Sequence, residues 1–403
     1  MDILFLHDNF PAQFGRLGQY LNRAGWRVRF ATRREGVAMD GVEVVPYKPH
    51  REVTKDIHPY AGAFEKAVLN GQAAARAALA LKDKGVRPDL IVAHSGWGPG
   101  FYMKDVWPDA KLVGYYEWYY NSPGPDVAFL NDDAPGDHDR LRARSRNAPI
   151  LMDLAHGDAG LCPTNWQQAQ FPPLFRDKLA VHHDGVDTAY FAPKPGARLK
   201  LPNLDLSQAD EIITYVARGM EPYRGFPQFM EALAHVQKMR PGAHGVIVGA
   251  DRIAYGAALP EGESYKTRAL ETLDLDPART HFTGLLPRDQ YRAVLQASSV
   301  HIYLTVPFVL SWSMMEAMSA GCLLIASDTS PVREVVSDGK TGLLTDFFDT
   351  KALAEKIADA LEAPEAYRGI RAAARQTISE HYAVTKLFPQ KKAFLEAVAA
   401  GLG

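Results

Sequence analysis

The chain has 403 residues, of which 47 % are hydrophobic, so a packed globular protein with more than one domain is expected. Lys and Arg number 45 against 47 Asp and Glu, a net charge of -2, so the chain lacks the basic excess that bulk nucleic-acid binding requires. The two cysteines, Cys162 and Cys322, show no metal-ligand spacing and indicate buried thiols in a reducing compartment.

The first half of the chain alternates short β-branched or aliphatic runs with helical patterns. Strands are predicted at 3–6, 27–31, 42–45, 90–93, 112–116 and 179–182, and the clearest helices at 13–24 and 61–82. Continuous apolar strands that alternate with helices indicate a parallel sheet covered on both faces. This half is therefore predicted to form a Rossmann-like α/β domain.

The second half repeats the scheme after a stretch rich in Pro, Lys and polar residues, which has no period and indicates a linker. Strands are predicted at 212–217, 245–248, 300–304, 323–326 and 342–344, and helices at 228–239, 263–273, 288–296 and 353–361. The predicted organisation is an N-terminal domain at 1–191, a linker at 192–210, a C-terminal domain at 211–382 and a helix at 383–403 that can return to the first domain. Two such domains facing each other would bind ligands in a cleft at the carboxyl ends of their strands.

Two arginines follow the first strand of the second domain. Arg218 lies at the tip of this strand, and Arg224 lies six residues later, before Gly225 and a helix. Two guanidinium groups beside a helix N-terminus suit a diphosphate. Two exposed loop arginines remain the alternative.

A second group lies near residue 316, after the strand at 300–304. A helix is expected to begin near Ser313, and Glu316 could accept hydrogen bonds from a ribose diol, with the amides of 310–312 facing the same ligand. These donor-side residues are Leu310, Ser311 and Trp312. Because Ser313 and Glu316 are three residues apart, a capping box is the competing interpretation.

The third group lies in the first domain. Gly15 falls at a strand-to-helix turn, where a missing Cβ lets the backbone approach a ligand. His94 and Glu117 each end a predicted strand, although a structural role is equally open to them. The aromatic run around Trp118 could stack on a sugar, lie at a lipid interface or form a core cluster.

Metal and cofactor signals are weak. The pairs Asp137/Asp139 and Asp274/Asp276 have a metal-binding spacing that arises often by chance, and the second does not follow a strand. The sequence has no dinucleotide glycine fingerprint, P-loop or zinc spacing. No metal and no cofactor are therefore expected.

The motifs together resemble the retaining GT-B glycosyltransferases of the large fourth family (glycosyl transferases group 1). In the second domain the family's pieces occur in order, as the basic pair at 218 and 224, then VIVGA, HFTGLLP, EAMSAGC and SDTSPVREVVSDGKTGLL. The first domain is similar more loosely, through CPTNWQQAQF and HHDGVDTAYF. The combined set is specific, whereas no single motif would be.

This resemblance implies roles for individual residues. Arg218 and Arg224 would hold the diphosphate and stabilise the leaving group, and Glu316 would bind the ribose. Leu285 would flank the base, and Gly15 would lie near the phosphates. Glu117 lies at the strand end where many members of the family carry a His near the reacting sugar. From the residues alone, His94 and Trp118 are predicted to lie on the acceptor side.

The chain departs from the family at three positions. Phe308 stands where the first Glu of the paired-Glu motif contacts donor-sugar hydroxyls, so the sugar identity is open. Arg224 replaces the usual Lys, which keeps the charge but changes the geometry. Glu117 replaces the usual His, so acceptor activation can differ.

The implied activity is transfer of a hexose-type sugar from a nucleoside-diphosphate-sugar, with UDP the expected nucleotide, to a hydroxyl acceptor such as a lipid or growing polysaccharide. Retention and metal independence are part of the same expectation. An epimerase, a phosphorylase, a non-catalytic nucleotide-sugar binder and a dinucleotide oxidoreductase are the alternatives. The N-terminus lacks a signal-peptide pattern, and no stretch approaches the ~20 apolar residues of a membrane span, so a cytoplasmic location with peripheral contact at the inner face of the membrane is expected.

Overall fold

The computed structural model describes residues 1–130, 136–256 and 259–402, which form two compact units. The N-terminal unit comprises Met1–Ala128, Asp133–Asp184 and Thr385–Gly403, and the C-terminal unit comprises Phe129–Asp132 and Gly185–Val384. Each unit is built on its own parallel sheet. The α/β class with two parallel sheets is thereby confirmed.

The N-terminal sheet has seven parallel strands in the order β3-β2-β1-β4-β5-β6-β7. Their bounds are β1 Asp2–Leu6, β2 Arg27–Thr32, β3 Glu43–Pro46, β4 Leu90–His94, β5 Lys111–Tyr115, β6 Ala159–Cys162 and β7 Leu179–Val181. The central strands β1 and β4 are almost wholly buried, as their unbroken apolar runs predict. The strand β6 was not predicted, because its sequence AGLC has no β-branched residue.

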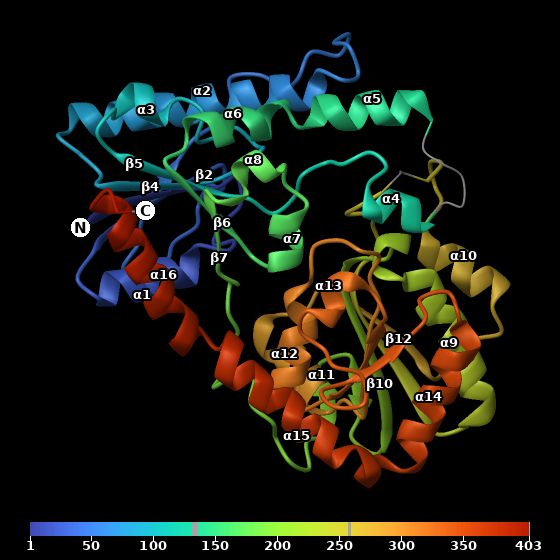
Figure 1. The fold of residues 1–403 in the computed structure, drawn as a ribbon. Helices are drawn as coiled ribbons and strands as arrows, with labels where there is room; N and C mark the ends of the chain where they lie inside the picture. The colour runs from blue at the N-terminus through green and yellow to red at the C-terminus, as the bar shows by residue number, and fades with distance from the viewer. Residues whose placement is uncertain (131–135, 257–258, 403) are drawn as a thin grey trace. The chain divides into compact units, whose positions relative to one another are not determined.

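Helices cover both faces of this sheet (Figure 1). Their bounds are α1 Gly15–Arg23, α2 Gly62–Asp83, α3 Met103–Val106, α4 Pro125–Leu130, α5 Asp137–Arg146, α6 Ala148–His156, α7 Asn165–Ala169 and α8 Pro173–Arg176. In Figure 1, α2 and α6 lie over one face, while α1 lies on the other with the C-terminal helix α16, Val384–Ala399.

The C-terminal sheet has six parallel strands in the order β12-β11-β10-β13-β14-β15. Their bounds are β10 Glu211–Gly219, β11 Ala243–Ala250, β12 Thr280–Gly284, β13 Val300–Tyr303, β14 Leu323–Ser327 and β15 Leu343–Thr345. The helices are α9 Phe226–Met239, α10 Tyr265–Thr272, α11 Arg288–Gln296, α12 Trp312–Ala320, α13 Ser330–Arg333, α14 Thr350–Glu362 and α15 Arg368–Thr377. The helices α9 and α14 pack on each other, and α12 packs on α11 and on α15.

The segment 192–210, predicted as a linker, is not structureless. It contains an antiparallel pair, β8 Leu199–Leu201 and β9 Leu204–Leu206, within the C-terminal unit. Leu199, Leu201 and Leu206 are buried in a cluster with residues of the second sheet. The Leu-x-Leu alternation, which places the apolar side chains on one face, is the reason for this difference.

The helix α16 belongs to the N-terminal unit from Thr385 onward. Phe388 packs against Tyr20 of α1 with ring centroids 5.6 Å apart. Lys391 is 3 % exposed, and its Nζ lies 3.4 Å from Asp184 Oδ1, while the Tyr115 hydroxyl donates to both oxygens of Asp184. The last residue of the predicted C-terminal helix, Gly403, lies outside the described residues.

Candidate functional site

At the carboxyl end of β10, the residue Arg224 is a buried cation. Its side chain is held by Nη1, which donates to Thr305 Oγ1 at 2.9 Å and to Tyr303 Oη at 3.2 Å. Within the described residues these are its only side-chain hydrogen bonds, and no carboxylate lies within salt-bridge distance of it. The rings of Tyr255 and Phe308 lie 5.4 and 5.8 Å from the guanidinium carbon. Nε and Nη2 therefore remain available to an anionic ligand.

Arg218 differs from Arg224 because it is exposed near the end of β10. Between the two arginines lies Glu221, which is fully buried and which the sequence analysis missed. Its carboxylate accepts the backbone N–H groups of Ala254 and Tyr255, and burial raises its pKa. Glu221 therefore ties the loop after β11 to the turn that holds Arg224.

The capping-box interpretation of Glu316 is wrong. The helix α12 begins at Trp312 with Ser311 as its N-cap, so Glu316 lies at the fifth helical position, two residues beyond the reach of a capping box. Glu316 Oε2 instead accepts the hydroxyl of Tyr291, at 2.8 Å. Burial, followed by the charge of Glu316, raises the pKa of Tyr291 well above its ordinary value. Glu316 is half-buried.

The segment before α12, whose amides were predicted to face the donor, only partly matches this prediction. The backbone N–H of Ser311 donates to Tyr303 Oη at 2.8 Å, so this amide is already occupied. The Leu310 side chain packs in the apolar cluster beneath the helix, whereas Trp312 is 43 % exposed. Phe308 is buried and meets the rings of Tyr223 and Tyr255 edge-on, at 5.4 and 5.0 Å.

Leu285 lies at the end of β12 and is 68 % exposed. It follows Gly284, whose φ of 70° permits the sharp exit of the chain from the strand. An exposed apolar side chain at a strand end can cover the face of a flat base. This placement agrees with the role that the family resemblance implies.

In the N-terminal unit, β4 and β5 bring His94 and Glu117 together. His94 Nε2 lies 3.3 Å from Glu117 Oε2, and Gln13 Nε2 donates to Glu117 Oε1 at 2.6 Å. His94 Nδ1 must donate to the Ser95 carbonyl, 3.0 Å away, because a carbonyl only accepts. His94 and Glu117 therefore lie side by side at the carboxyl ends of neighbouring strands, with Gln13 holding the second carboxylate oxygen.

Gly15 is required for packing rather than for open space beside a ligand. A Cβ at this position would lie 2.4 Å from Pro11 Cβ and 3.1 Å from Met39 Cε. The loop before α1 still contains an unusual residue, Ala12, whose φ of 44° is in the left-handed region. Such backbone conformations persist where the surrounding structure holds them, often at functional sites.

Trp118 is only 9 % exposed, and its ring lies 5.6 Å from that of Trp166. Little of its indole is left for a sugar, in contrast to the sequence expectation. The indole that reaches the surface near His94 is Trp97, which is 38 % exposed and which the sequence analysis missed. Its position one residue before Gly98 and two after Ser95, in a loop at a strand end, could have drawn attention to it.

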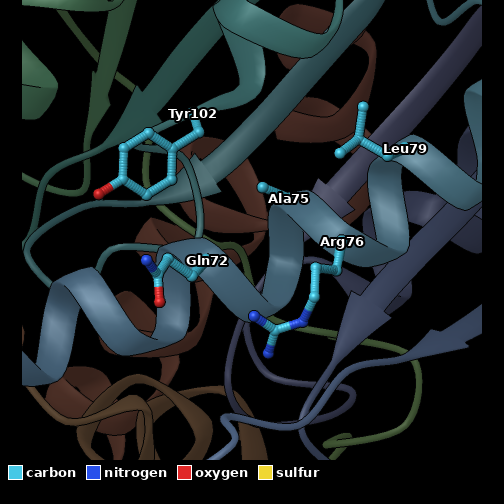
Figure 2. A pocket seen from close by; sticks show the side chains of 5 residues that line it. All are labelled: Gln72, Ala75, Arg76, Leu79 and Tyr102. Atoms are coloured by element: carbon cyan, nitrogen blue, oxygen red, sulfur yellow. The ribbon is translucent and has the colours of Figure 1, made fainter.

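Two surface cavities lie outside these groups. One, of about 430 Å³, is lined by Gln72, Ala75, Arg76, Leu79 and Tyr102 (Figure 2). Its only charged group, Arg76, already donates to the Lys48 carbonyl. The other, of about 310 Å³, follows β10 and β11 and has the carboxylates of Asp251 and Glu263 on its wall, which disfavour a diphosphate there.

The described residues contain no group of three or more His, Cys, Asp or Glu side chains that could hold a metal ion. Asp276 is paired with Arg279, Asp274 with Lys238 and Asp137 with Arg140. Across the part of the chain that the structure describes, no helix is long and apolar enough to cross a membrane.

The fold is that of the GT-B glycosyltransferases. A sucrose-phosphate synthase from Thermosynechococcus elongatus superposes with a TM-score of 0.74 at 18 % identity, covering 100 % of both chains. Anabaena HepE, solved in complex with UDP-glucose, gives 0.70 at 18 % identity and covers 98 % of this chain and 100 % of that one.

Within this class of fold, the sequence identifies the family. The glycosyl transferase family 4 group matches residues 24–191, and the glycosyl transferases group 1 matches residues 200–377. The two matches together span most of the chain, which belongs to this family of glycosyltransferases.

Curated relatives match only part of this chain. The α-maltose-1-phosphate synthase of Mycolicibacterium smegmatis is 25 % identical over 239 residues, 57 % of this chain and 59 % of the relative. The D-inositol 3-phosphate glycosyltransferase of Streptomyces scabiei is 27 % identical over 192 residues, 47 % of this chain and 42 % of the relative. The chain thus spans about half the length of the curated relatives it matches.

Proposed function

We propose that the protein is a retaining glycosyltransferase that moves a hexose-type sugar from a nucleoside-diphosphate-sugar to a hydroxyl acceptor without a metal ion. The proposal rests on the family to which the chain belongs and, in the structure, on one observation above all. Arg224 is a buried guanidinium whose Nε and Nη2 donors are not used by the described residues.

A diphosphate is the ligand that best fits this arrangement. A buried cation needs a compensating anion, and guanidinium groups bind phosphate oxygens through parallel N–H donors. Arg218, exposed at the end of the same strand, can add a second positive charge. As the glycosyl bond breaks, negative charge grows on the diphosphate, and these two cations would stabilise it in place of a metal.

Glu316 supports a nucleotide rather than a bare phosphate. Tyr291 donates to its Oε2, so the carboxylate is oriented, and a carboxylate can accept hydrogen bonds from a ribose diol. Leu285 would cover the base. The nucleotide itself is proposed to be UDP, as in the Anabaena HepE complexes, although one curated relative is named as GDP-mannose-dependent.

The Glu117–His94 pair would position a hydroxyl rather than remove its proton. Gln13 and His94 hold the two oxygens of Glu117 in place, which suits a positioning role. The Glu117 side chain, 27 % exposed, can still accept a hydrogen bond from a sugar or acceptor hydroxyl. The acceptor proton would then pass to the departing phosphate oxygen, as same-face attack with retention requires.

The proposal is tested by incubating the protein with UDP-, GDP- and ADP-sugars in EDTA and following nucleoside diphosphate release. Slow hydrolysis of one donor, made faster by a hydroxyl acceptor, is expected. If release occurs only with Mg²⁺ or Mn²⁺, the metal-free mechanism is wrong. If no donor is bound or consumed under either condition, the function itself is wrong.

Phe308 favours one second candidate, a nucleotide-sugar binder that does not transfer. An aromatic ring at this position offers no hydrogen bond to a sugar hydroxyl, and it is packed between Tyr223 and Tyr255. Such a protein would bind a nucleotide-sugar by calorimetry yet release no nucleoside diphosphate with any acceptor. Acceptor-stimulated turnover excludes this candidate.

A further inference from the structure

We infer that Trp97 is the acceptor-binding platform of the N-terminal unit, and that the acceptor it takes is a hydroxylated six-membered ring, a sugar or a cyclitol. This inference rests on the proposed transferase function and adds to it a residue and a substrate class.

The first argument is the exposure of the ring. The His94 ring stacks on the indole with centroids 4.2 Å apart and an interplanar angle of 29°, and the His7 ring meets it edge-on at 4.9 Å. Both histidines are buried. His94 therefore covers part of the indole, and 38 % of Trp97 remains exposed.

The second argument is that the loop holding Trp97 is fixed from below. The carboxylate of Asp153, a buried residue of α6, accepts the Ser95 hydroxyl at 2.9 Å and the Gly96 N–H at 2.8 Å. Asn70 Nδ2 donates to the Trp97 carbonyl at 3.0 Å. Gly98 has a φ of 93°, and a Cβ there would lie 1.8 Å from the Ala67 carbonyl oxygen. An apolar ring held this firmly in water favours a binding role over core packing.

The third argument is the polar group beside the platform. The His94 ring, on which Trp97 stacks, is also the ring whose Nε2 lies 3.3 Å from Glu117 Oε2. Trp97 thus belongs to the same cluster of side chains as the His94–Glu117 pair. Sugars and cyclitols combine an apolar face of C–H groups with hydroxyls on their rim, which fits stacking on an exposed indole.

Acceptor kinetics test this inference. The wild type is assayed with its preferred nucleotide-sugar and with glucose, mannose, maltose, myo-inositol and acyclic glycerol as acceptors. Trp97→Ala is expected to raise the KM for the ring acceptors about tenfold and to affect glycerol much less, while Trp97→Phe, which keeps an aromatic face, recovers most of the loss. Leu79→Ala, which removes another exposed apolar side chain of the same unit, is the matched control and should change neither.

A second readout does not depend on activity. The protein has six Trp residues, so 5-fluorotryptophan labelling gives at most six ¹⁹F resonances, and the Trp97→Phe variant identifies one of them. Ring compounds should shift the Trp97 resonance and glycerol should not. A ring acceptor that is used with unchanged KM by Trp97→Ala, or a panel that leaves the Trp97 resonance unmoved, would overturn the inference. Wild-type transfer in the same experiment would leave the proposed function intact.

Discussion

Arg224 is the residue on which the proposed chemistry depends most. Arg224→Ala should lower turnover at least ~10²-fold, because losing one charge-stabilising contact to a leaving group costs about 2.7–4 kcal/mol. Arg224→Lys keeps the charge but loses the planar set of Nε and Nη2 donors proposed to bind the diphosphate, so an intermediate rate is expected. Steady-state kinetics measure both. A folded Arg224→Ala variant with a near-wild-type rate would remove Arg224 from the mechanism.

Glu316 gives a separate prediction on binding. Glu316→Gln keeps one carbonyl oxygen but replaces the other oxygen by a donor, so the ribose loses a charged hydrogen bond. Such a bond contributes roughly 1.5–3 kcal/mol, which corresponds to about a 10- to 150-fold rise in the donor dissociation constant. Calorimetric titration with a nucleoside diphosphate measures this change in the dissociation constant. Tyr291→Phe, which frees Glu316 but leaves its charge, should weaken binding less. An unchanged affinity in Glu316→Gln would contradict a ribose-binding role.

Asp153 predicts a pH dependence of stability. Burial raises its pKa from 3.8 to about 6 in the folded protein. A raised carboxyl pKa means that its stabilising contribution is present below pH 3.8 and is lost as the pH rises through about 6. The loss is on the order of 3 kcal/mol. Asp153→Asn, which cannot ionise, should therefore gain thermal stability relative to the wild type between pH 4 and pH 7. A difference in Tm that is the same at both pH values would contradict this.

The positions of candidate residues at strand ends could be predicted from the sequence. Which side chains are exposed or buried could not. Arg218 and Glu117 follow from their strand ends alone. Trp97 and Glu221 do not, because only the folded chain shows which indole stays in water and which carboxylate is buried. The clearest case is the exposed indole near His94, which is Trp97 and not the predicted Trp118.

At the scale of elements, periodicity located most strands within a few residues, but short elements were missed. The helix α12 illustrates why boundaries matter. A capping box with Glu316 would need Ser313 as the N-cap, whereas the N-cap in the structure is Ser311. This difference of two residues removes the capping-box interpretation of Glu316. The hairpin β8–β9 was missed because Pro and Lys in the same segment are typical of linkers.

The C-terminal helix α16 gives a prediction at this scale. Lys391→Met would leave the buried Asp184 carboxylate without its cation, and such a loss costs about 3–5 kcal/mol. Because Tyr115 still donates to Asp184, a cost at the lower end of this range is expected. Hydrogen exchange of the α16 amides should quicken about 100-fold. Lys392→Met, which breaks the partly exposed pair with Glu396, is the control and should have little effect. Equal exchange in both variants would show that the buried pair does not hold the helix.

At the scale of the whole molecule, the class of fold was predictable because both halves repeat one pattern of apolar strands and amphipathic helices. The two parallel sheets and the family follow from that pattern and from the motifs of the second half. The division of the chain was harder to predict. The first division falls after Asp184, where no composition change marks it, whereas the second falls after Val384, two residues from the predicted start of the returning helix.

The central claim is retaining transfer from a nucleoside-diphosphate-sugar without a metal. Time-resolved ¹H NMR of the protein with an α-linked UDP-sugar and a ring acceptor in EDTA tests it most directly, because the anomeric proton of the new glycoside reports its configuration as it forms. The account predicts an α-configured product that appears together with free UDP, and a loss of both signals in Arg224→Ala. A β-configured product, or no product from UDP-, GDP- or ADP-sugars, would contradict it.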